Sequence, residues 1–323
     1  MDGPTLAPCA HRTTMSDSIP PPDFPPDAPA FELTHPFDKV AGADAILRSS
    51  DGVDFCVHRA ILSLASPVFE TMFRLPQPQP QDSNSGPIDL PVVDVSERSV
   101  ALERALRFFY PGTHPDSKTL EELGEAIDVL MKYDVQCQVP ALKHRLEHYH
   151  ASSPLRVYAI AIRHGWKDAA VAAARESLKQ PLRSFGDLPK ELDAITGSAY
   201  HHLLQYHLTC GEVARSITAS PTWFACPVNI FNYCGCPKAP VHVTFANNQA
   251  VIVSAWFHKY LTDTGDILNR CPGLSVTQAA SFHAAMIHPS KCGHCQLFDF
   301  LGFATVLLPA QIQVELDKVE LKF

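Results

Sequence analysis

The chain has 323 residues and is 46% hydrophobic, which is enough for two or more domains with packed cores. Its formal charge of −8 argues against a general nucleic-acid binder, because phosphate contacts require clustered Lys and Arg. No signal peptide is visible, and the longest apolar run, residues 301–310, is shorter than the ~18 residues needed to span a bilayer and contains Pro309. We therefore expect a cytoplasmic or nuclear protein without membrane or direct nucleic-acid partners, whose cysteines are mostly reduced or metal-bound.

A β-hairpin is predicted after a head, residues 1–35, that is rich in Pro and Asp and expected to be disordered. Residues 45–49 and 53–57 have the composition of short strands. Asp51-Gly52 lies between them and favours a type I′ turn, which needs positive φ at both central positions.

Two short helices are predicted after the hairpin. An apolar pattern begins after His58-Arg59, and Ser66-Pro67 lies inside it. Because Pro is tolerated at a helix start, Ser66 is expected to cap a second helix whose first residue is Pro67. A polar, low-complexity loop occupies 76–87. Beyond it we expect a strand over 88–93 and amphipathic helices over 96–110, 119–133 and 140–149.

The segment from residue 153 to about 220 is predicted to be helical throughout, with Gly165 as a helix C-cap. After Pro221 the content of Cys, Pro and aromatic residues rises. Within this tail, residues 250–260 have a helical pattern. The apolar stripe of 309–323 is expected to dock on the chain's own core, and it consists of Ile312, Leu316, Val319 and Phe323.

Several aromatic and histidine side chains are given structural roles. Trp223 and Trp256 are expected to anchor the small core of the tail. A solvated or packed helix face is expected for His201, His202 and His207, because no carboxylate lies at metal-ligand spacing from them.

The segment from Asp44 to Phe73, taken with motifs downstream, resembles the BTB/POZ domain. The motifs that carry the resemblance are Asp44-Ala-Ile-Leu47, Asp51-Gly52, Phe55-Cys-Val-His58, Ala60-Ile-Leu-Ser63, Ser66-Pro-Val-Phe69, Met72-Phe73, Phe108-Phe-Tyr-Pro-Gly112 and Leu130-Met-Lys-Tyr-Asp-Val135. They cover about a third of the chain. The whole layout, with a helical extension and a Cys-rich tail, is similar to BTB proteins of mushroom-forming fungi.

The resemblance implies an α+β fold, in which a cluster of helices is flanked by short strands and followed by a mostly α-helical C-terminal region. We expect a disordered head over 1–35, a BTB/POZ domain over 36–150, a helical extension over 151–220 and a Cys/Trp-containing region over 221–323.

The resemblance also implies binding to other proteins. The first hypothesis is a homodimeric scaffold or adaptor, since some members of the family bridge substrates to a cullin-type ubiquitin ligase. A nuclear transcription cofactor is the alternative. The residues that the resemblance implies at an interface are Asp44, Phe55, His58 and Phe69. Asp44 is then a buried interface carboxylate, or else simply a strand-edge cap, and His58 is expected to bond backbone groups rather than act as a general base.

Two features depart from the family pattern. The polar insertion at 76–87 lies near the surface that cullin adaptors use. The Pro-rich head stands where some members have a strand and helix that are exchanged across the dimer. The dimer geometry and cullin binding are therefore not transferred directly.

The cysteines of the tail allow more than one chemistry. A tetrahedral zinc site needs four ligands, and the candidates are Cys234, Cys236, Cys292 and Cys295. His294 and Cys226 are alternative ligands. Packing as small hydrophobic side chains is the competing interpretation, and redox or disulfide chemistry is a third. An enzyme using Cys292, Cys295 and His294 is the alternative from another functional class, but no nucleophile or phosphate-loop motif accompanies them, so we expect no enzyme.

Overall fold

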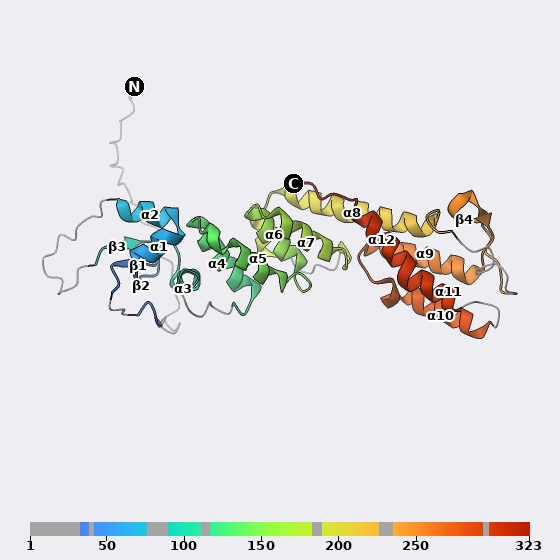
Figure 1. Ribbon diagram of the computed structural model, residues 1–323, viewed down its shortest axis with the longest axis horizontal. Coiled ribbons are helices and arrows are strands. Elements are labelled where there is room, and N and C mark those ends of the chain that lie inside the picture. The colour runs from blue at the N-terminus through green and yellow to red at the C-terminus, as the bar shows by residue number, and fades with distance from the viewer. Residues whose placement is uncertain are drawn as a thin grey trace, which may run out of the picture.

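A computed structural model describes residues 33–38, 42–75, 90–110, 117–182, 189–225, 235–292 and 297–323. The molecule is elongated, with the N-terminal strands at one end and the last helices at the other (Figure 1). The C-terminus returns to the middle of the molecule. Most of the predicted N-terminal head and the predicted loop at 76–87 lie outside the described residues.

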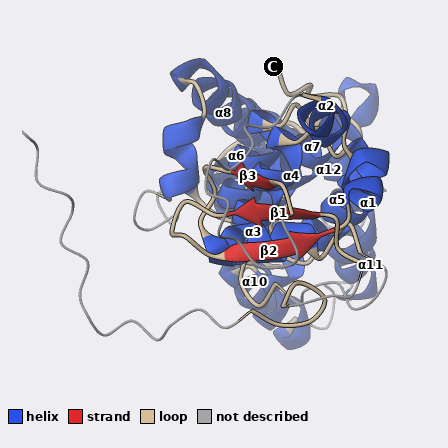
Figure 2. Cartoon of the chain, turned by 90° about the vertical axis from the view of Figure 1, so that its left-hand side faces the viewer, coloured by secondary structure: helices blue, strands red, loops and turns tan. Residues whose placement is uncertain are grey.

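The N-terminal end holds a three-stranded sheet of order β2-β1-β3, packed against helices (Figure 2). The elements in chain order are β1 (Ala45–Arg48), β2 (Asp54–Val57), α1 (Arg59–Ala65), α2 (Pro67–Arg74), β3 (Val92–Asp94) and α3 (Ser99–Leu106). β1 pairs antiparallel with β2 and parallel with β3, with Leu47 opposite both Phe55 and Val93. Alternate residues of β1 and β2 are buried, so one face of the sheet covers the core.

The predicted hairpin is confirmed, but the predicted turn type is wrong. Gly52 has φ of +82°, whereas Asp51 does not have positive φ, so the turn is not type I′. Instead, the Gly52 N–H donates to the Ser49 carbonyl at 3.0 Å, and Ser49 and Val53 close the loop. The Asp51 carboxylate accepts hydrogen bonds from the backbone N–H and the hydroxyl of Ser99, at 2.9 and 2.8 Å. This contact fixes the conformation of Asp51 and places the start of α3 at Ser99, three residues after the predicted start.

The predicted break between the first two helices is confirmed. Ser66 caps α2, where its Oγ accepts a hydrogen bond from the Phe69 N–H at 3.1 Å, and Pro67 is the first helical residue. The same hydroxyl donates to the Tyr133 carbonyl at 2.5 Å, so this cap also ties α2 to the segment after α4.

The middle of the molecule is helical, as predicted. It contains α4 (Leu120–Lys132), the 3₁₀ turn η1 (Gln136–Gln138), α5 (Val139–Glu147), α6 (Pro154–Arg163), α7 (Lys167–Ser177), the 3₁₀ turn η3 (Lys190–Ala194) and α8 (Gly197–Ala219). Gly165 has φ of +70° directly after α6, which confirms the predicted C-cap. The long helix α8 leads from this middle part to the far end of the molecule (Figure 1).

The C-terminal part packs against α8. It contains β4 (Val243–Thr244), the 3₁₀ turn η4 (Ala246–Asn248), β5 (Ala250–Val251), α9 (Ala255–Arg270), the 3₁₀ turn η5 (Val276–Gln278), α10 (Ala280–Lys291), α11 (Leu297–Gly302), the π-helical turn η6 (Phe303–Leu307) and α12 (Leu308–Leu316). The helix predicted over 250–260 begins only at Ala255. The preceding residues are extended, because β5 pairs with β4 and the Val253 carbonyl accepts from the Ala239 N–H.

Aromatic rings fill the core of this part, as predicted for the two tryptophans. The Trp256 ring lies 5.3 Å from the ring of Phe300, and the Trp223 ring stacks 5.8 Å from that of Phe303. Ile312 and Leu316 are buried, so the predicted docking of the last stripe on the chain's own core is confirmed for α12. The helix ends at Leu316, and Phe323 lies beyond it, half exposed, with the Lys167 ammonium 5.1 Å from its ring centre.

The apolar stretch near the C-terminus is longer in the structure than the sequence suggested. Leu297–Leu316 forms one continuous 20-residue helix with a mean hydropathy of 1.5, long and apolar enough by length and composition to cross a membrane. A helix that packs one face in a protein core passes the same test, and this helix does so through Phe300, Ala304 and Leu308. The absence of a membrane partner stays a prediction.

Candidate functional site

The surface of α1 and α2 carries the apolar side chains that stand out at the N-terminal end. Leu64 is 91% exposed, the largest exposed fraction of any large apolar side chain among the described residues. We call the exposed and half-buried apolar side chains of these two helices the α1–α2 surface, which consists of Ala60, Ile61, Leu64, Val68 and Met72. The charges of α2 pair with each other, Arg74 with Glu70 at 2.5 Å, so they need no partner from outside.

Asp44 holds the start of α1. Its Oδ1 accepts a hydrogen bond from the backbone N–H of Arg59, the first residue of the helix, at 2.7 Å. A carboxylate at a helix N-terminus satisfies an otherwise unpaired donor and complements the helix dipole. Asp44 is exposed within the single chain. The structure thus gives Asp44 a contact at a helix start, which differs from the strand-edge cap considered from the sequence, and burial of Asp44 against a second chain stays a prediction.

His58 is held by a tyrosine from the end of α3. The His58 backbone N–H donates to the Tyr110 hydroxyl at 2.9 Å, and the ring Nδ1 lies 3.3 Å from the same oxygen. Burial raises the pKa of Tyr110, and the negative charge of Asp44 raises it further, so the phenol stays protonated. The ring of His58 therefore contacts a side-chain hydroxyl and not the backbone groups that the sequence predicted.

Phe55 and Phe69 lie in the core and not on an interaction surface. Their exposed fractions are 0% and 1%. The Phe69 ring stacks on that of Tyr133 at 4.3 Å, and the Phe55 ring meets that of Phe37 edge-on at 6.0 Å. Direct contact of these two side chains with a partner is therefore excluded by their packing, and they support the helices that carry the surface.

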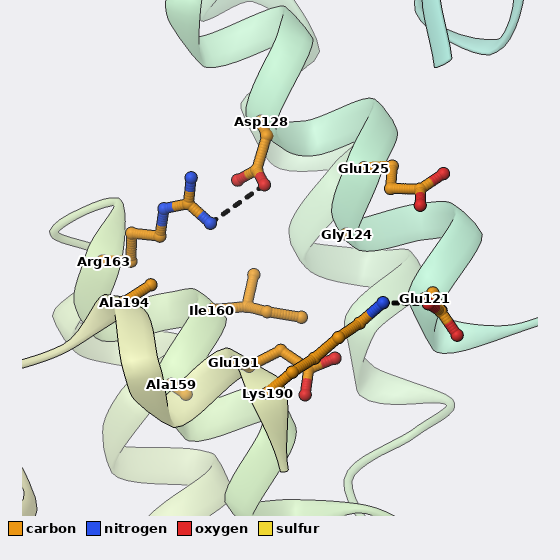
Figure 3. Close-up of a pocket in the computed structure, with 10 residues that line it drawn as sticks. All are labelled: Glu121, Gly124, Glu125, Asp128, Ala159, Ile160, Arg163, Lys190, Glu191 and Ala194. Atoms are coloured by element: carbon orange, nitrogen blue, oxygen red, sulfur yellow. Dashed lines mark hydrogen bonds and ion pairs between the residues drawn. The ribbon is translucent and has the colours of Figure 1, made fainter. Parts of the chain in front are cut away.

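A cleft of about 250 Å³ lies where α4 meets α6 and η3 (Figure 3). Gly124 and Ile160 form its apolar floor, and a Cβ on Gly124 would lie 3.5 Å from Ile160 Cδ1. Ion pairs cross its rim. The Arg163 guanidinium donates to Asp128 at 2.9 Å, and the Lys190 ammonium donates to Glu121.

The charged groups of this cleft serve to join α4 to the following helices. His164 also lies 3.0 Å from Asp128, and outside the cleft Lys143 of α5 pairs with Asp168 of α7 at 2.7 Å. These carboxylates already have cationic partners. No nucleophile bonded to a base occurs among the residues that line the cleft.

Residues 33–149 match the family model of the BTB/POZ domain. This part of the chain is a BTB/POZ domain. The search of curated proteins found no match. The α+β class and the mostly helical C-terminal region are confirmed, and the BTB/POZ domain supports a role in protein–protein interaction.

The proposed zinc ligands lie in the tail, outside the BTB/POZ domain, and are only partly described. Cys236 and Cys292 are half-buried. Cys234, Cys295 and the alternatives Cys226 and His294 lie outside the described residues. Within the described ranges, no three or more His, Cys, Asp or Glu side chains are grouped as metal ligands would be. Zinc binding by the four cysteines stays a prediction.

The histidines of α8 also lie outside the BTB/POZ domain. His207 is buried, and its Nε2 lies 3.0 Å from the Gln180 carbonyl. Burial lowers the pKa of His207, so the ring is neutral near pH 7 and donates to that carbonyl. This is the packed role that the sequence predicted. His201 is exposed beside His202, with ring centres 6.4 Å apart.

Sequence reasoning missed Tyr110 and Leu64. Tyr110 appeared only as part of a helix-ending motif, and its contact with His58 spans 52 positions of chain. The sequence did not indicate that Leu64 is exposed, because the helical pattern of apolar residues in α1 continues through it. The one signal was its position two residues after Leu62, since residues two apart on an α-helix point to nearly opposite sides.

Proposed function

We propose that the protein is a scaffold or adaptor that binds other proteins, and that its BTB/POZ domain forms a homodimer through the α1–α2 surface. The observation that carries this proposal is the exposure of Leu64 beside the other exposed and half-buried apolar side chains of the α1–α2 surface. Full burial of a leucine stabilises an interface by about 1.5–3 kcal/mol. A two-fold axis at this surface would bury Leu64 of both copies.

Paired charges around the surface favour the same arrangement. Glu70 and Arg74 form an ion pair within α2, and the Arg59 guanidinium donates to the Phe73 carbonyl and lies over the Phe73 ring. Groups that are already satisfied lose little when a partner displaces water from them. The role is non-enzymatic, because an adaptor requires affinity and geometry rather than activated side chains.

The dimer can be tested by light scattering coupled to size-exclusion chromatography on the full chain at about 1 μM. We expect Leu64→Asp to shift the mass from two copies to one, because a desolvated carboxylate is costly at an interface. Leu208→Asp is the matched control, since Leu208 is an exposed leucine of α8 at the other side of the domain junction. Equal masses for the two variants would rule out the α1–α2 surface as the interface.

Bridging to a cullin-type ubiquitin ligase, and the alternative of a nuclear transcription cofactor, are finer proposals that rest on the family resemblance. Affinity purification of the full chain from its native host, followed by mass spectrometry, distinguishes them. A cullin subunit recovered with the wild-type chain supports the first proposal. Recovery of DNA-binding proteins without any cullin subunit contradicts it and supports the second.

A further inference from the structure

The helix Leu297–Leu316 has an apolar face that the described part of the chain leaves exposed. Phe298 is 87% exposed, Val306 61% and Val314 52%. Only 28% of the apolar window in this helix is buried inside the structure. Scattered single hydrophobic residues are normal on protein surfaces, but several on one helix require an explanation.

The π-helical turn η6 keeps the buried residues of this helix on one side of it. The buried residues Phe300, Ala304, Leu308, Ile312 and Leu316 follow each other at intervals of four. At about 100° per residue, sixteen residues of regular α-helix would turn the last of them roughly 160° away from the first. The π turn takes up one extra residue, which reduces the difference to about 60°. The core residues therefore share one face.

The same correction aligns the exposed residues on the opposite side. The residues on that side also follow at intervals of four, and we call them the exposed stripe: Phe298, the half-buried Gly302, Val306, Ala310 and Val314. The space outside Gly302 is open, because a Cβ there would have no atom within 4 Å. Figure 1 shows α11 and α12 in the C-terminal part, separated from the strands of the BTB/POZ domain by the helices of the middle part.

We propose that the exposed stripe binds the exposed stripe of a second copy of this chain, antiparallel, about a two-fold axis near Val306. A two-fold contact needs a surface that is complementary to itself. Val306 is eight residues from Phe298 and eight from Val314. At 1.5 Å per residue both lie about 12 Å from it along the helix, so antiparallel copies place Phe298 against Val314.

Side-chain size fits this pairing. The largest residue of the stripe, Phe298, meets the smaller Val314. Gly302 and Ala310 lie four residues on either side of Val306, so the small side chains of the two copies also oppose each other. Small residues at these positions let the two helix backbones approach closely around the axis.

Charge and composition favour a second copy over a lipid surface. Residues 300–314 contain no charged side chain, and the whole helix contains no Lys or Arg. Helices that lie on membranes are typically rich in Lys and Arg on their polar face, which attract anionic lipids. Glu315, at the C-terminal end, is already paired with Lys318 at 2.8 Å, which limits repulsion between the copies.

The exposed area sets the expected strength. The side chains of Phe298, Val306 and Val314, together with that of Leu307, expose on the order of 400 Å² per copy. Two copies would bury about twice that area, which is below the roughly 1,200–2,000 Å² of a stable specific interface. We therefore expect weak association, with a Kd of about 10–100 μM. The inference does not depend on the α1–α2 dimer.

The test uses the full chain carrying Leu64→Asp, which removes the α1–α2 contact, in sedimentation equilibrium from about 5 to 300 μM. We expect reversible dimerisation. Adding Phe298→Asp or Gly302→Leu should weaken the dimerisation at least tenfold. Gly302→Leu introduces no charge, and its side chain would extend into open space. Val241→Asp, at an exposed valine elsewhere in the tail, is the control and should have no effect. Unchanged circular dichroism and melting temperature verify that each variant is folded.

Cross-linking tests the register. A Val306→Cys chain should form a 306–306 disulfide between copies, identified by peptide mass spectrometry, whereas Phe298→Cys should link to Val314→Cys but not to itself. The proposal is overturned if the Leu64→Asp chain stays monomeric at 300 μM, or if Phe298→Asp and Gly302→Leu leave association unchanged. Binding of the monomer to phosphatidylcholine vesicles that Phe298→Asp abolishes would identify a lipid surface instead.

Discussion

At the residue scale, hydrogen bonds to the Glu97 carboxylate determine its protonation state. Its side chain is 8% exposed, accepts from the Tyr133 hydroxyl at 2.7 Å and pairs with Lys132. Burial alone would raise the pKa of Glu97. The hydrogen bonds from Lys132 and Tyr133, with the charge of Lys132, outweigh burial and lower the pKa below its ordinary value near 4.5. The same contact and burial raise the pKa of Tyr133.

Glu97→Gln should therefore destabilise the protein in a pH-dependent way. A carboxylate with a lowered pKa contributes stability that is fully present above its unfolded value and is lost as pH falls below it. We expect the variant to lose about 1–3 kcal/mol in free energy of unfolding at pH 7. That difference should shrink below about pH 4.5, as measured by urea unfolding. Glu70→Gln, at an exposed ion pair, is the control and should cost under about 1 kcal/mol. If the difference in free energy of unfolding between the wild type and Glu97→Gln does not change with pH, the lowered pKa of Glu97 is contradicted.

At the scale of elements, the close packing of α8 on α9 depends on one glycine in each helix. A Cβ on Gly211 would lie 2.3 Å from the Asn269 carbonyl oxygen, and a Cβ on Gly265 would lie 2.4 Å from Thr218 Oγ1. Cβ atoms essentially never lie that close to another atom, so the two helices can approach this closely because both positions are glycine. This packing holds the helices of the C-terminal part on the long α8.

Gly211→Ala should separate these helices. The new methyl group meets backbone, which cannot rotate away, so we expect a loss of about 1–3 kcal/mol in thermal or urea unfolding. Gly197→Ala, at the first residue of α8 with no atom within 4 Å, is the matched control. It should be neutral or stabilising by up to about 1 kcal/mol, because alanine restricts the unfolded chain. Equal effects at the two positions would show that α8 and α9 are less closely packed than described.

At the scale of the whole molecule, one continuous core joins the BTB/POZ domain to the helices that follow it. Buried residues from Phe37 to Leu321 belong to a single cluster. Ile160 of α6 is 5% exposed and lies under Gly124 of α4, while the ion pair between Arg163 and Asp128 lies at the rim of the same cleft with both side chains about 40% exposed. Apolar contact should therefore dominate this junction.

Two substitutions compare the contribution of the apolar contact with that of the ion pair. Ile160→Ala should cost about 2–5 kcal/mol, because it removes buried methyl groups and leaves a cavity. Asp128→Asn should cost less than about 1 kcal/mol, because exposed ion pairs contribute little in water. Urea unfolding of the full chain measures both. A larger effect for Asp128→Asn would mean that the charged rim, and not the core, holds the domain to its extension.

The sequence by itself determined the hairpin, the break at Ser66-Pro67, the C-cap at Gly165 and the BTB/POZ motifs. These features depend on contacts within a few residues, so composition and spacing along the chain reveal them. Only the tertiary structure decided that Asp51 caps α3, that Tyr110 holds His58, that Phe55 and Phe69 are core residues, and that a π turn leaves Phe298 and Val314 exposed on one side. Those contacts join residues far apart in the chain, and their geometry follows from packing, which no local pattern records.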